Sequence, residues 1–321
     1  MKKVIFKIIE FFVLFIKRIK LDSYFFDKLI FYIGYNQITQ NRKNYENIRD
    51  IKSAEVKIFS QNGEDGILDY LLYKLNLTPN STNFVEIGVG DYRESNTRFL
   101  YSLYHPKGVI VDCIEKMNSR VKKNVNLWKG DLRICNTIVT TNNIEELLNE
   151  HCDFNIDIFS IDIDSVDYWI IKKLKKNISK IFVAEYNPVF GSKLKVTVPN
   201  IDGFERNKYH YSNLCYGMSL RALIDVMKEK NYYFIGTNIQ KMNAFFISNE
   251  YNKDKFFKDV NISELENYVD SNIRDSRDKN YNLNYLSGDN KLKVIEDCEV
   301  IDLENEKHQL IKIKDLLKIK K

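Results

Sequence analysis

The chain has few of the residues that usually interrupt or cross-link a fold: its 321 residues include 12 glycines, four prolines and five cysteines. The scarcity of glycine and proline, beside abundant lysine, asparagine and isoleucine, is more readily explained by an AT-rich genome than by a binding task. The cysteines are odd in number and form no C-x-x-C pair, which indicates a reducing compartment. We therefore expect a cytoplasmic protein.

A strong excess of charge of one sign is also missing. The 49 basic and 44 acidic residues give a net charge of +5, and the small basic clusters, at residues 17–20, 172–176 and 312–321, are spread along the chain. A nucleic-acid-binding protein would be expected to concentrate its basic residues on one face. We therefore predict no nucleic-acid partner, and the apolar content of 44% indicates a globular protein with a substantial core.

No hydrophobic run is long enough to cross a bilayer. The N-terminal sequence MKKVIFKIIEFFVLFIKRIK has the basic start and apolar stretch of a signal peptide, but Lys7 and Glu10 interrupt it and no small-residue cleavage site follows. Residues 4–16 are too few to span a bilayer as a helix. The segment is therefore expected to be neither a signal peptide nor a transmembrane helix.

The same segment has the spacing of an amphipathic helix. Lys3, Lys7, Glu10 and Lys17 lie on one narrow stripe, with a broad apolar face opposite. Such a helix can lie on an anionic membrane, which would give peripheral contact through residues 1–20 with the inner face of the cytoplasmic membrane. It can also pack on its own domain or on a partner subunit, and the sequence leaves both alternatives open.

From about residue 55, short apolar segments alternate with helical patterns. This alternation predicts an α/β fold with a parallel sheet covered by helices on both faces. The expected strands are NFVEIGVG, KGVIVDCI, LRICNTIVT, IDIFSIDID and KIFVAEYNP. NYYFIGTN and NAFFIS follow, and the few residues between them allow a hairpin but no crossover helix, so the last strand should be antiparallel.

These patterns divide the chain into three parts. Residues 1–50 are expected to form an amphipathic helical N-terminal appendage, and residues 51–250 the domain that carries the sheet. Residues 251–321 are expected to form a polar C-terminal extension that ends in a helix, HQLIKIKDLLKIKK.

Polar or acidic residues follow four of the expected strands. In an open α/β sheet, ligands bind beyond the carboxyl ends of the strands. The residues at these ends are Glu86 with Gly88 and Gly90, Asp112, Asp162 with Asp164, and Glu185 with Asn187. Four such strand ends on one edge predict a binding site.

The first of these ends, FVEIGVGDYRESN, allows a ligand to approach the backbone closely at Gly88 and Gly90. Asp112, after the second strand, can accept hydrogen bonds from both hydroxyls of a ribose. This combination suits a dinucleotide or S-adenosylmethionine, but the dinucleotide fingerprint lacks its third glycine because DYR follows Gly90. Glu86 before the glycines and the final antiparallel strand favour S-adenosylmethionine. The alternative is a strand-to-helix turn with no ligand.

Residues 56–300 resemble the class I S-adenosylmethionine-dependent methyltransferases, and more narrowly an FkbM-like bacterial group often found with surface-glycan genes. The matching segments are FSQNGEDGIL, FVEIGVGDYRESNT, DIFSIDIDSVDYWI, VAEYNPVFG with TVP, YGMSLRALI, NAFFIS and RDSRDKNYNLNYLSG. The sequence departs from the family pattern at Tyr92, where glycine is usual, and at Ser165, where glycine commonly follows the acids of the fourth strand.

The resemblance implies a Rossmann-like fold with a mostly parallel sheet of seven strands. It also implies S-adenosylmethionine as cofactor and methyl transfer to an oxygen of a sugar or other surface-polysaccharide precursor. The acceptor would be a small molecule or a glycan. A rival interpretation is a non-catalytic binding or scaffold protein in glycan assembly, which keeps the fold without the chemistry.

Cofactor contacts are expected from strand ends and from the loop SQNGEDG, which precedes the first helix of the sheet domain. Gln61 and Glu64 of this loop could reach over the cofactor, or the loop could merely cap that helix. The predicted cofactor-binding residues are Gln61, Glu64, Glu86, Gly88, Gly90, Asp112 and Asp162.

The acids of the fourth and fifth strands form a second candidate site. Asp162, Asp164, Glu185 and Asn187 offer the oxygen ligands that suit Mg²⁺ or Mn²⁺, and metal-dependent O-methyltransferases resemble this arrangement. A metal there could lower the pKa of an acceptor hydroxyl, so Asp162 and Asp164 are also candidate catalytic residues. Alternatively, Asp162 orients the cofactor, and Asp164 or Asp167 caps the following helix.

A long insertion between the fifth and sixth strands is expected to contact the acceptor. It contains Lys193, Lys195, Arg206, His210 and Tyr211, which could meet a phosphate or a sugar. Among the four histidines of the chain, His210 is the best-placed candidate for a catalytic base.

Overall fold

The computed structural model describes residues 23–251, 276–304 and 308–319, together with the single residues Lys7, Phe257 and Val260. The expected amphipathic helix of residues 1–20 therefore lies outside the described residues, apart from Lys7.

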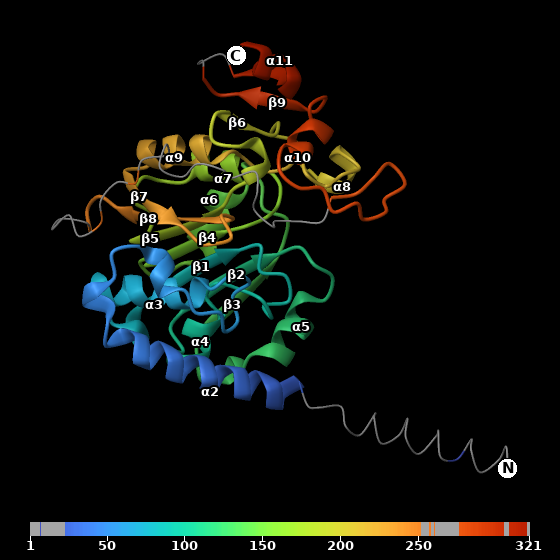
Figure 1. The fold of residues 1–321 in the computed structure, drawn as a ribbon. Coiled ribbons are helices and arrows are strands. Elements are labelled where there is room, and N and C mark those ends of the chain that lie inside the picture. The colour runs from blue at the N-terminus through green and yellow to red at the C-terminus, as the bar shows by residue number, and fades with distance from the viewer. Residues whose placement is uncertain are drawn as a thin grey trace.

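A seven-stranded sheet forms the centre of the molecule, in the order β3-β2-β1-β4-β5-β8-β7 (Figure 1). Its strands are β1 (Phe84–Ile87), β2 (Gly108–Asp112), β3 (Leu132–Asn136), β4 (Ile158–Ile161), β5 (Ile181–Glu185), β7 (Tyr232–Thr237) and β8 (Asn243–Ser248). Only β8 is antiparallel to its neighbours, β5 and β7. The predicted α/β fold, a Rossmann-like and mostly parallel sheet of seven strands with a C-terminal antiparallel hairpin, is confirmed.

The strand register brings the predicted site residues to one edge of the sheet. Ile87, the last residue of β1, is paired with Val111 of β2 on one side and with Ile161 of β4 on the other. Because these strands are parallel, Gly88, Asp112 and Asp162 leave the sheet side by side. The chain crosses from β3 at one edge to β4 beside β1, so this is also the point where the strand order reverses, where open α/β sheets bind ligands.

Helices cover both faces of the sheet (Figure 1). Successive strand residues point to opposite faces, so Val85 and Ile87 pack in one core and Phe84 in another. On the first face lie α6 (Ile144–His151), α7 (Asp167–Lys173) and α9 (Leu220–Glu229); on the second lie α3 (Glu64–Lys74), α4 (Arg98–Tyr104) and α5 (Met117–Asn124). Short 3-10 helices complete the connections at Tyr45–Asn47, Ile51–Ala54, Pro79–Ser81, Leu127–Lys129 and Pro188–Phe190.

The long helix α2 (Ser23–Arg42) runs along the outside of the second face (Figure 1). Arg42 near its end pairs with Asp69 of α3 and donates to the Tyr104 hydroxyl of α4 at 2.7 Å. Asp27 near its start pairs with Arg98 at the start of α4, at 2.7 Å. The Asp27–Arg98 ion pair and the Arg42–Tyr104 hydrogen bond place α2 alongside α4.

A small second sheet joins the insertion after β5 to the C-terminal part of the chain. Its order is β10-β9-β6, formed by β6 (Val196–Thr197), β9 (Glu299–Asp302) and β10 (Gln309–Lys312), all antiparallel. The short helices α8 (Arg206–Tyr209), α10 (Asp289–Val294) and α11 (Ile313–Ile319) surround it. The prediction of one helix from residue 308 is therefore wrong over 309–312, because these residues pair with β9 before α11 begins.

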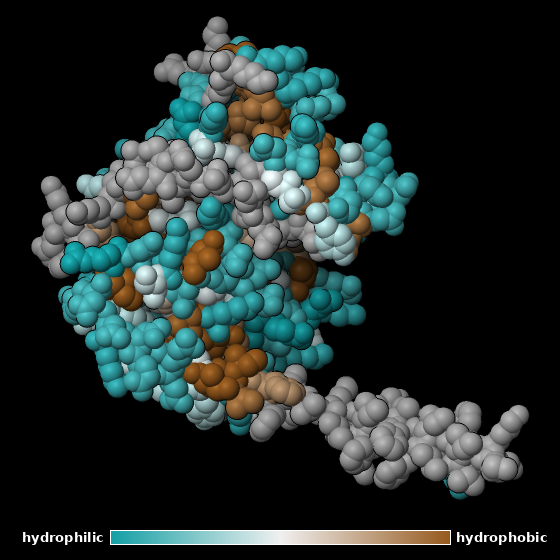
Figure 2. Space-filling view, in the orientation of Figure 1, coloured by the Kyte–Doolittle hydropathy of each residue, from teal (hydrophilic) through white to brown (hydrophobic). Residues whose placement is uncertain are grey.

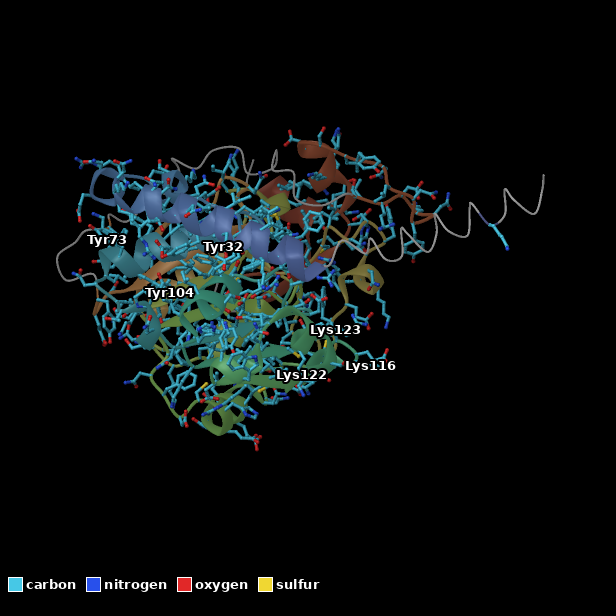
Figure 3. The ribbon with its side chains drawn as sticks, turned by 90° about the horizontal axis from the view of Figure 1, so that it is seen from below. Tyr32, Tyr73, Tyr104, Lys116, Lys122 and Lys123 are labelled. Carbon is cyan, nitrogen blue, oxygen red and sulfur yellow. The ribbon has the colours of Figure 1, made fainter. Side chains whose placement is uncertain are left out.

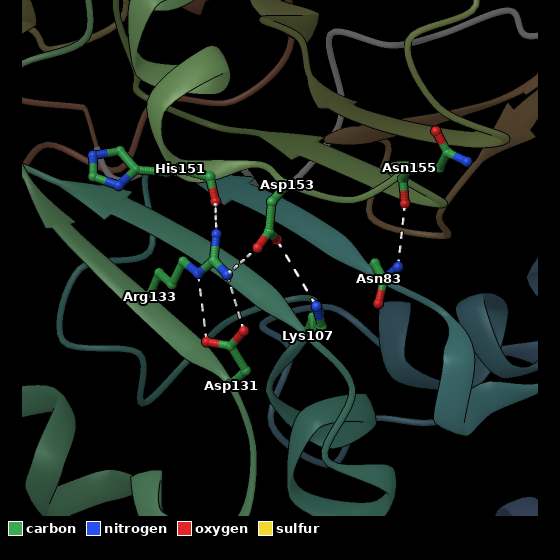
Figure 4. Close-up of polar contacts among 7 residues, drawn as sticks. All are labelled: Asn83, Lys107, Asp131, Arg133, His151, Asp153 and Asn155. Carbon is green, nitrogen blue, oxygen red and sulfur yellow. Dashed lines mark hydrogen bonds and ion pairs between the residues drawn. The ribbon is translucent and has the colours of Figure 1, made fainter.

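The amino edge of the main sheet is closed by polar contacts (Figure 4). Arg133 pairs with Asp131 at 3.1 Å and with Asp153 at 2.9 Å, and it also donates to the His151 carbonyl. Lys107 lies 3.9 Å from the same Asp153 carboxylate. This edge is held by ion pairs between loops, so a ligand site is expected at the opposite, carboxyl edge.

Within the described part of the chain, no helix combines the length and apolar character needed to cross a lipid bilayer.

Candidate functional site

A cavity of about 870 Å³ lies at the carboxyl edge of the sheet, large enough for a cofactor-sized ligand. The loops after β1, β2, β3 and β4 line it, together with residues 201–205 of the insertion. Of the predicted site residues, it brings together Gln61, Glu86, Gly88, Gly90, Asp112, Asp162 and Asp164. Glu64, Glu185, Asn187 and His210 are not among the described residues that line it.

Gly88 and Gly90, in the loop after β1, are glycines for different structural reasons. Gly88 has a φ of +89°, and a Cβ there would lie 1.5 Å from the Asp162 carbonyl oxygen, so the loops after β1 and β4 can touch only if this residue is glycine. Gly90 has a φ of +55°, and its absent Cβ would face open space. Gly90 therefore exposes backbone to the cavity and leaves room for a ligand.

Tyr92, where the family pattern has glycine, keeps the backbone conformation of a glycine. Its φ is +62°, which costs a non-glycine residue about 1 kcal/mol. Its side chain is fully buried, and its hydroxyl lies 2.9 Å from Thr97 Oγ1. The ring is absent from the cavity lining, so this departure leaves the cavity open.

Glu86 is a buried carboxylate that organises the cavity wall. It accepts hydrogen bonds from the Ser95 hydroxyl at 2.6 Å, from the Asn96 amide at 2.8 Å, and from the amide and hydroxyl of Thr97. Burial raises the pKa of Glu86, while these donors favour its charged form. Glu86 binds these groups just before α4, which begins at Arg98 with Thr97 as its N-cap residue.

Asp112 connects the end of β2 to the glycine loop. Its Oδ2 accepts a hydrogen bond from the Gly90 amide at 2.7 Å, and its Oδ1 accepts one from the Ile114 amide at 3.0 Å. A carboxylate has about four acceptor positions, so both oxygens can still accept from ligand hydroxyls at the cavity rim.

The loop SQNGEDG is built around two buried acids. Asp65 Oδ2 accepts from the amides of Ile58, Phe59 and Ser60 at 2.8 Å, and burial raises the pKa of Asp65 to about 6. Glu64 Oε1 accepts from the side-chain amides of Asn238 and Asn243, at 2.8 and 2.7 Å. Glu64 therefore ties α3 to the β7–β8 hairpin from behind the cavity, whereas Gln61 lines the cavity itself.

Three of the four predicted metal ligands converge. Carboxylate oxygens of Asp162, Asp164 and Glu185 all lie within 4.8 Å of one another, close enough to bind one ion. Asp164 also forms an ion pair with Arg206 of α8. Asn187 is not part of this cluster, and its side chain binds backbone groups instead. Its Nδ2 donates to the carbonyls of Leu214 and Tyr216, and its Oδ1 accepts from the Val189 amide.

The cavity is strongly acidic. Its lining includes the carboxylates of Glu86, Asp91, Glu94, Asp112, Asp162, Asp164, Asp202 and Glu205. Among the described lining residues, Arg93 alone carries a positive charge. Although the whole chain has a net charge of +5, the field inside this cavity therefore favours a cationic ligand over an anionic one.

No protein family profile and no curated protein matches the sequence. Solved structures do match. One is an S-adenosylmethionine-dependent methyltransferase from Clostridium acetobutylicum, 12% identical, covering 67% of this chain and 98% of its own, with a TM-score of 0.37. Another is an O-methyltransferase family protein from Burkholderia thailandensis, 9% identical, covering 65% of this chain and 69% of its own, with a TM-score of 0.36. At TM-scores below 0.5, these similarities carry no weight for function, and the fold stands on its strand order.

His210, the residue directly after α8, lines a second hollow of about 830 Å³. Its Nδ1 lies 2.7 Å from the Ser212 hydroxyl, and burial lowers the pKa of His210. The hollow is lined by Asn207, Lys208, Tyr209, His210, Tyr211, Asn213, Arg277 and Tyr281. The structure therefore does not bring His210 to the cavity that holds Asp162 and Asp164.

Two parts of the cavity wall were not predicted from the sequence. Residues 137–140 follow β3, and residues 201–205 come from the insertion. The first could have been found, because the end of β3 lies at the same edge as the other strand ends. The second lies in the insertion that was expected to contact the acceptor, but none of the five residues singled out there is among the described residues that line the cavity. Lys195, for example, pairs with Asp225 at 2.7 Å.

Proposed function

We propose that the protein is a methyltransferase that uses S-adenosylmethionine. The observation that carries the proposal is an acidic cavity at the carboxyl edge of the sheet, beside a G-x-G loop and an aspartate at the end of β2. The sulfonium of S-adenosylmethionine is a cation, which this cavity favours, whereas the pyrophosphate of a dinucleotide is an anion, which it disfavours. Bound there, S-adenosylmethionine would supply an activated methyl group for transfer.

Residues on different sides of the cavity would bind or enclose the cofactor. The open side of Gly90 would admit the cofactor against the backbone, and Asp112 would accept hydrogen bonds from its ribose hydroxyls. Glu86, which accepts a hydrogen bond from the Asn96 amide, would hold Asn96 in place in the cavity wall. Gln61 would close the cavity from the α3 side.

For the acceptor, we propose a neutral hydroxyl of a sugar or another surface-polysaccharide precursor in the bacterial cytoplasm. The acidic cavity favours a neutral acceptor over an anionic one, and the sugar itself rests on the resemblance to the FkbM-like group. The new oxygen–methyl bond would form as the sulfur–methyl bond breaks and S-adenosylhomocysteine leaves, and Asp162 or Asp164 would accept the hydroxyl proton. Most of the rate enhancement would come from holding the two reactants in line.

The convergent carboxylates support a further part of the proposal, a divalent cation such as Mg²⁺ or Mn²⁺ held by Asp162, Asp164 and Glu185. Arg206 competes for Asp164. We therefore expect calorimetric titration with Mn²⁺ to show binding that tightens about tenfold in Arg206→Ala, because one charge–charge contact is removed. If neither the wild type nor Arg206→Ala binds Mn²⁺ detectably, the acids act without a metal.

The proposal is tested by calorimetric titration of the protein with S-adenosylmethionine and with NAD⁺. We expect S-adenosylmethionine to bind and NAD⁺ not to bind. Asp112→Asn should weaken binding at least about tenfold, since it removes the charge from two hydrogen bonds to the ribose. Asp131→Asn is the matched control, because it makes the same change at the amino edge of the sheet, and it should bind as the wild type does.

The rival function is a non-catalytic scaffold, which the departures at Tyr92 and Ser165 favour. The titration separates the two proposals. Failure of the wild type to bind S-adenosylmethionine at millimolar concentration would favour the scaffold.

A further inference from the structure

Helix α2 has apolar residues on two opposite faces. On the inner face, Phe31, Tyr35 and Ile38 pack against a small core that includes Phe59 and Phe99. On the outer face, residues at helical spacing remain in solvent: Phe26, Leu29, Ile30 and Ile33 are 41, 43, 43 and 59% exposed. Figure 2 shows a brown patch at the lower edge of the main body, in the region where Figure 1 draws α2.

The apolar outer face ends abruptly along the helix. One and two turns after Ile33, the same side of α2 carries the polar residues Gln37 and Gln40. The exposed apolar surface is therefore confined to the part of α2 that lies closest to Ser23, where the chain enters the helix.

Basic side chains of α5 lie beside this apolar surface. Arg98 joins the two helices, because its guanidinium pairs with Asp27 of α2 at 2.7 Å and donates to the Asn124 carbonyl of α5 at 3.0 Å. Helix α5 has the sequence MNSRVKKN, without an acidic residue, and its Lys122 and Lys123 are exposed. Seen from below, Tyr32 of α2 and these two lysines lie on one side of the molecule (Figure 3).

The charge of this region is positive after its ion pairs are accounted for. Arg98 neutralises Asp27. Lys116 lies 3.2 Å from Glu115, so that pair adds little net charge. Arg120, Lys122 and Lys123 remain as the basic flank of the apolar surface.

We propose that this surface, formed by Phe26, Leu29, Ile30, Ile33, Lys122 and Lys123 and called here the α2–α5 face, docks on an anionic lipid bilayer. Apolar side chains that enter the headgroup region, flanked by lysines that meet anionic lipids, are the features by which peripheral proteins bind such a surface. The proposal does not depend on methyl transfer.

Two observations favour a bilayer over a second copy of the chain. A symmetric contact would need an acidic surface opposite Lys122 and Lys123, and α5 and the outer face of α2 offer none. In the sequence, α2 follows the basic and apolar residues 1–20, for which a helix on an anionic membrane is one of the two alternatives that the sequence leaves open.

The test is cosedimentation of the full chain with phosphatidylcholine vesicles that do or do not contain phosphatidylserine. We expect binding only with phosphatidylserine, and less binding in high salt. Ile30→Glu with Ile33→Glu, and separately Lys122→Glu with Lys123→Glu, should each lower the bound fraction about tenfold. Circular dichroism spectra and melting curves like those of the wild type show that the variants are folded.

Matched controls make the same chemical changes elsewhere. Leu310→Glu alters an exposed apolar residue of β10, at the other end of the molecule, and Lys175→Glu with Lys176→Glu alters exposed lysines after α7. Both controls should bind as the wild type does. The proposal is overturned if the wild type ignores anionic vesicles, or if the α2 and α5 variants bind them as well as the controls do. It is also overturned if Ile30→Glu with Ile33→Glu abolishes only a dimer seen by sedimentation velocity.

Discussion

Gly88, Gly90 and Tyr92 lie in one loop, and all three have backbone in the left-handed region. They differ in what surrounds the Cβ position. At Gly88 it is filled by the Asp162 backbone, at Gly90 it is open, and at Tyr92 a real side chain turns into the core. The same backbone conformation therefore has a packing role at Gly88 and a ligand-admitting role at Gly90.

This difference predicts different outcomes for one substitution. Gly88→Ala should destabilise the protein by at least about 3 kcal/mol, because the loops after β1 and β4 must separate. Gly90→Ala should cost only about 1 kcal/mol of unfolding free energy, from its positive φ, yet weaken S-adenosylmethionine binding. Urea unfolding and calorimetry measure the two effects, and equal stability of the two variants would contradict this account.

Asp65 provides a prediction on pH dependence. Its Oδ2 accepts several hydrogen bonds while its buried Oδ1 has no hydrogen-bond partner among the described residues, and burial raises its pKa from 3.8 to about 6. The folded state then binds more protons than the unfolded state between these values. Stability from this group is therefore present below about pH 4 and is lost as the pH rises to about 6.

The expected change is on the order of 2 kcal/mol, and Asp65→Asn should remove it. Urea unfolding of both proteins at several values between pH 4 and pH 7 measures the difference in slope. Parallel curves for the wild type and the variant would show that the Asp65 carboxyl keeps an ordinary pKa.

At the scale of elements, two arginines join segments in different surroundings. Arg98 is buried, with its guanidinium 3.9 Å from the Phe59 ring centroid, and connects α2, α4 and α5. Arg133 joins loops at the amino edge, where its carboxylate partners are largely exposed. We expect burial, and not the number of contacts, to decide which arginine contributes more to the free energy of unfolding.

Arg98→Met should lower the free energy of unfolding by about 3 kcal/mol, because it leaves Asp27 and backbone carbonyls without a partner. Arg133→Met should lower it by about 1 kcal/mol or less, since exposed ion pairs are weak. Chemical unfolding at neutral pH measures both. A larger effect at Arg133 than at Arg98 would refute the argument from burial.

At the scale of the molecule, the sequence predicts the sheet better than it predicts the site. Apolar segments alternating with helices predict the parallel strands, and the short link between the last two strands predicts that the last one is antiparallel. The parallel register then brings Gly88, Asp112 and Asp162 to one edge. The orientation of a polar side chain depends on partners distant in sequence. Glu64 turns to Asn238 and Asn243, and Asn187 turns to backbone carbonyls, contacts that local sequence does not reveal.

The C-terminal part shows the same limit. Residues 309–312 have the apolar spacing of the helix that follows them, yet they form a strand because β9 lies beside them. His210 follows α8, a helix of four residues that the sequence does not predict, and it lines the second hollow instead of the cavity. In both places tertiary contacts determine the structure.

The central claim, that the acidic cavity at the carboxyl edge is a cofactor site, is tested most directly by a crystal structure of the protein grown with S-adenosylhomocysteine. The account predicts the ligand beside Gly90, with its ribose hydroxyls within hydrogen-bonding distance of the Asp112 carboxylate. A ligand bound elsewhere, or a cavity without ligand at saturating concentration, would contradict it.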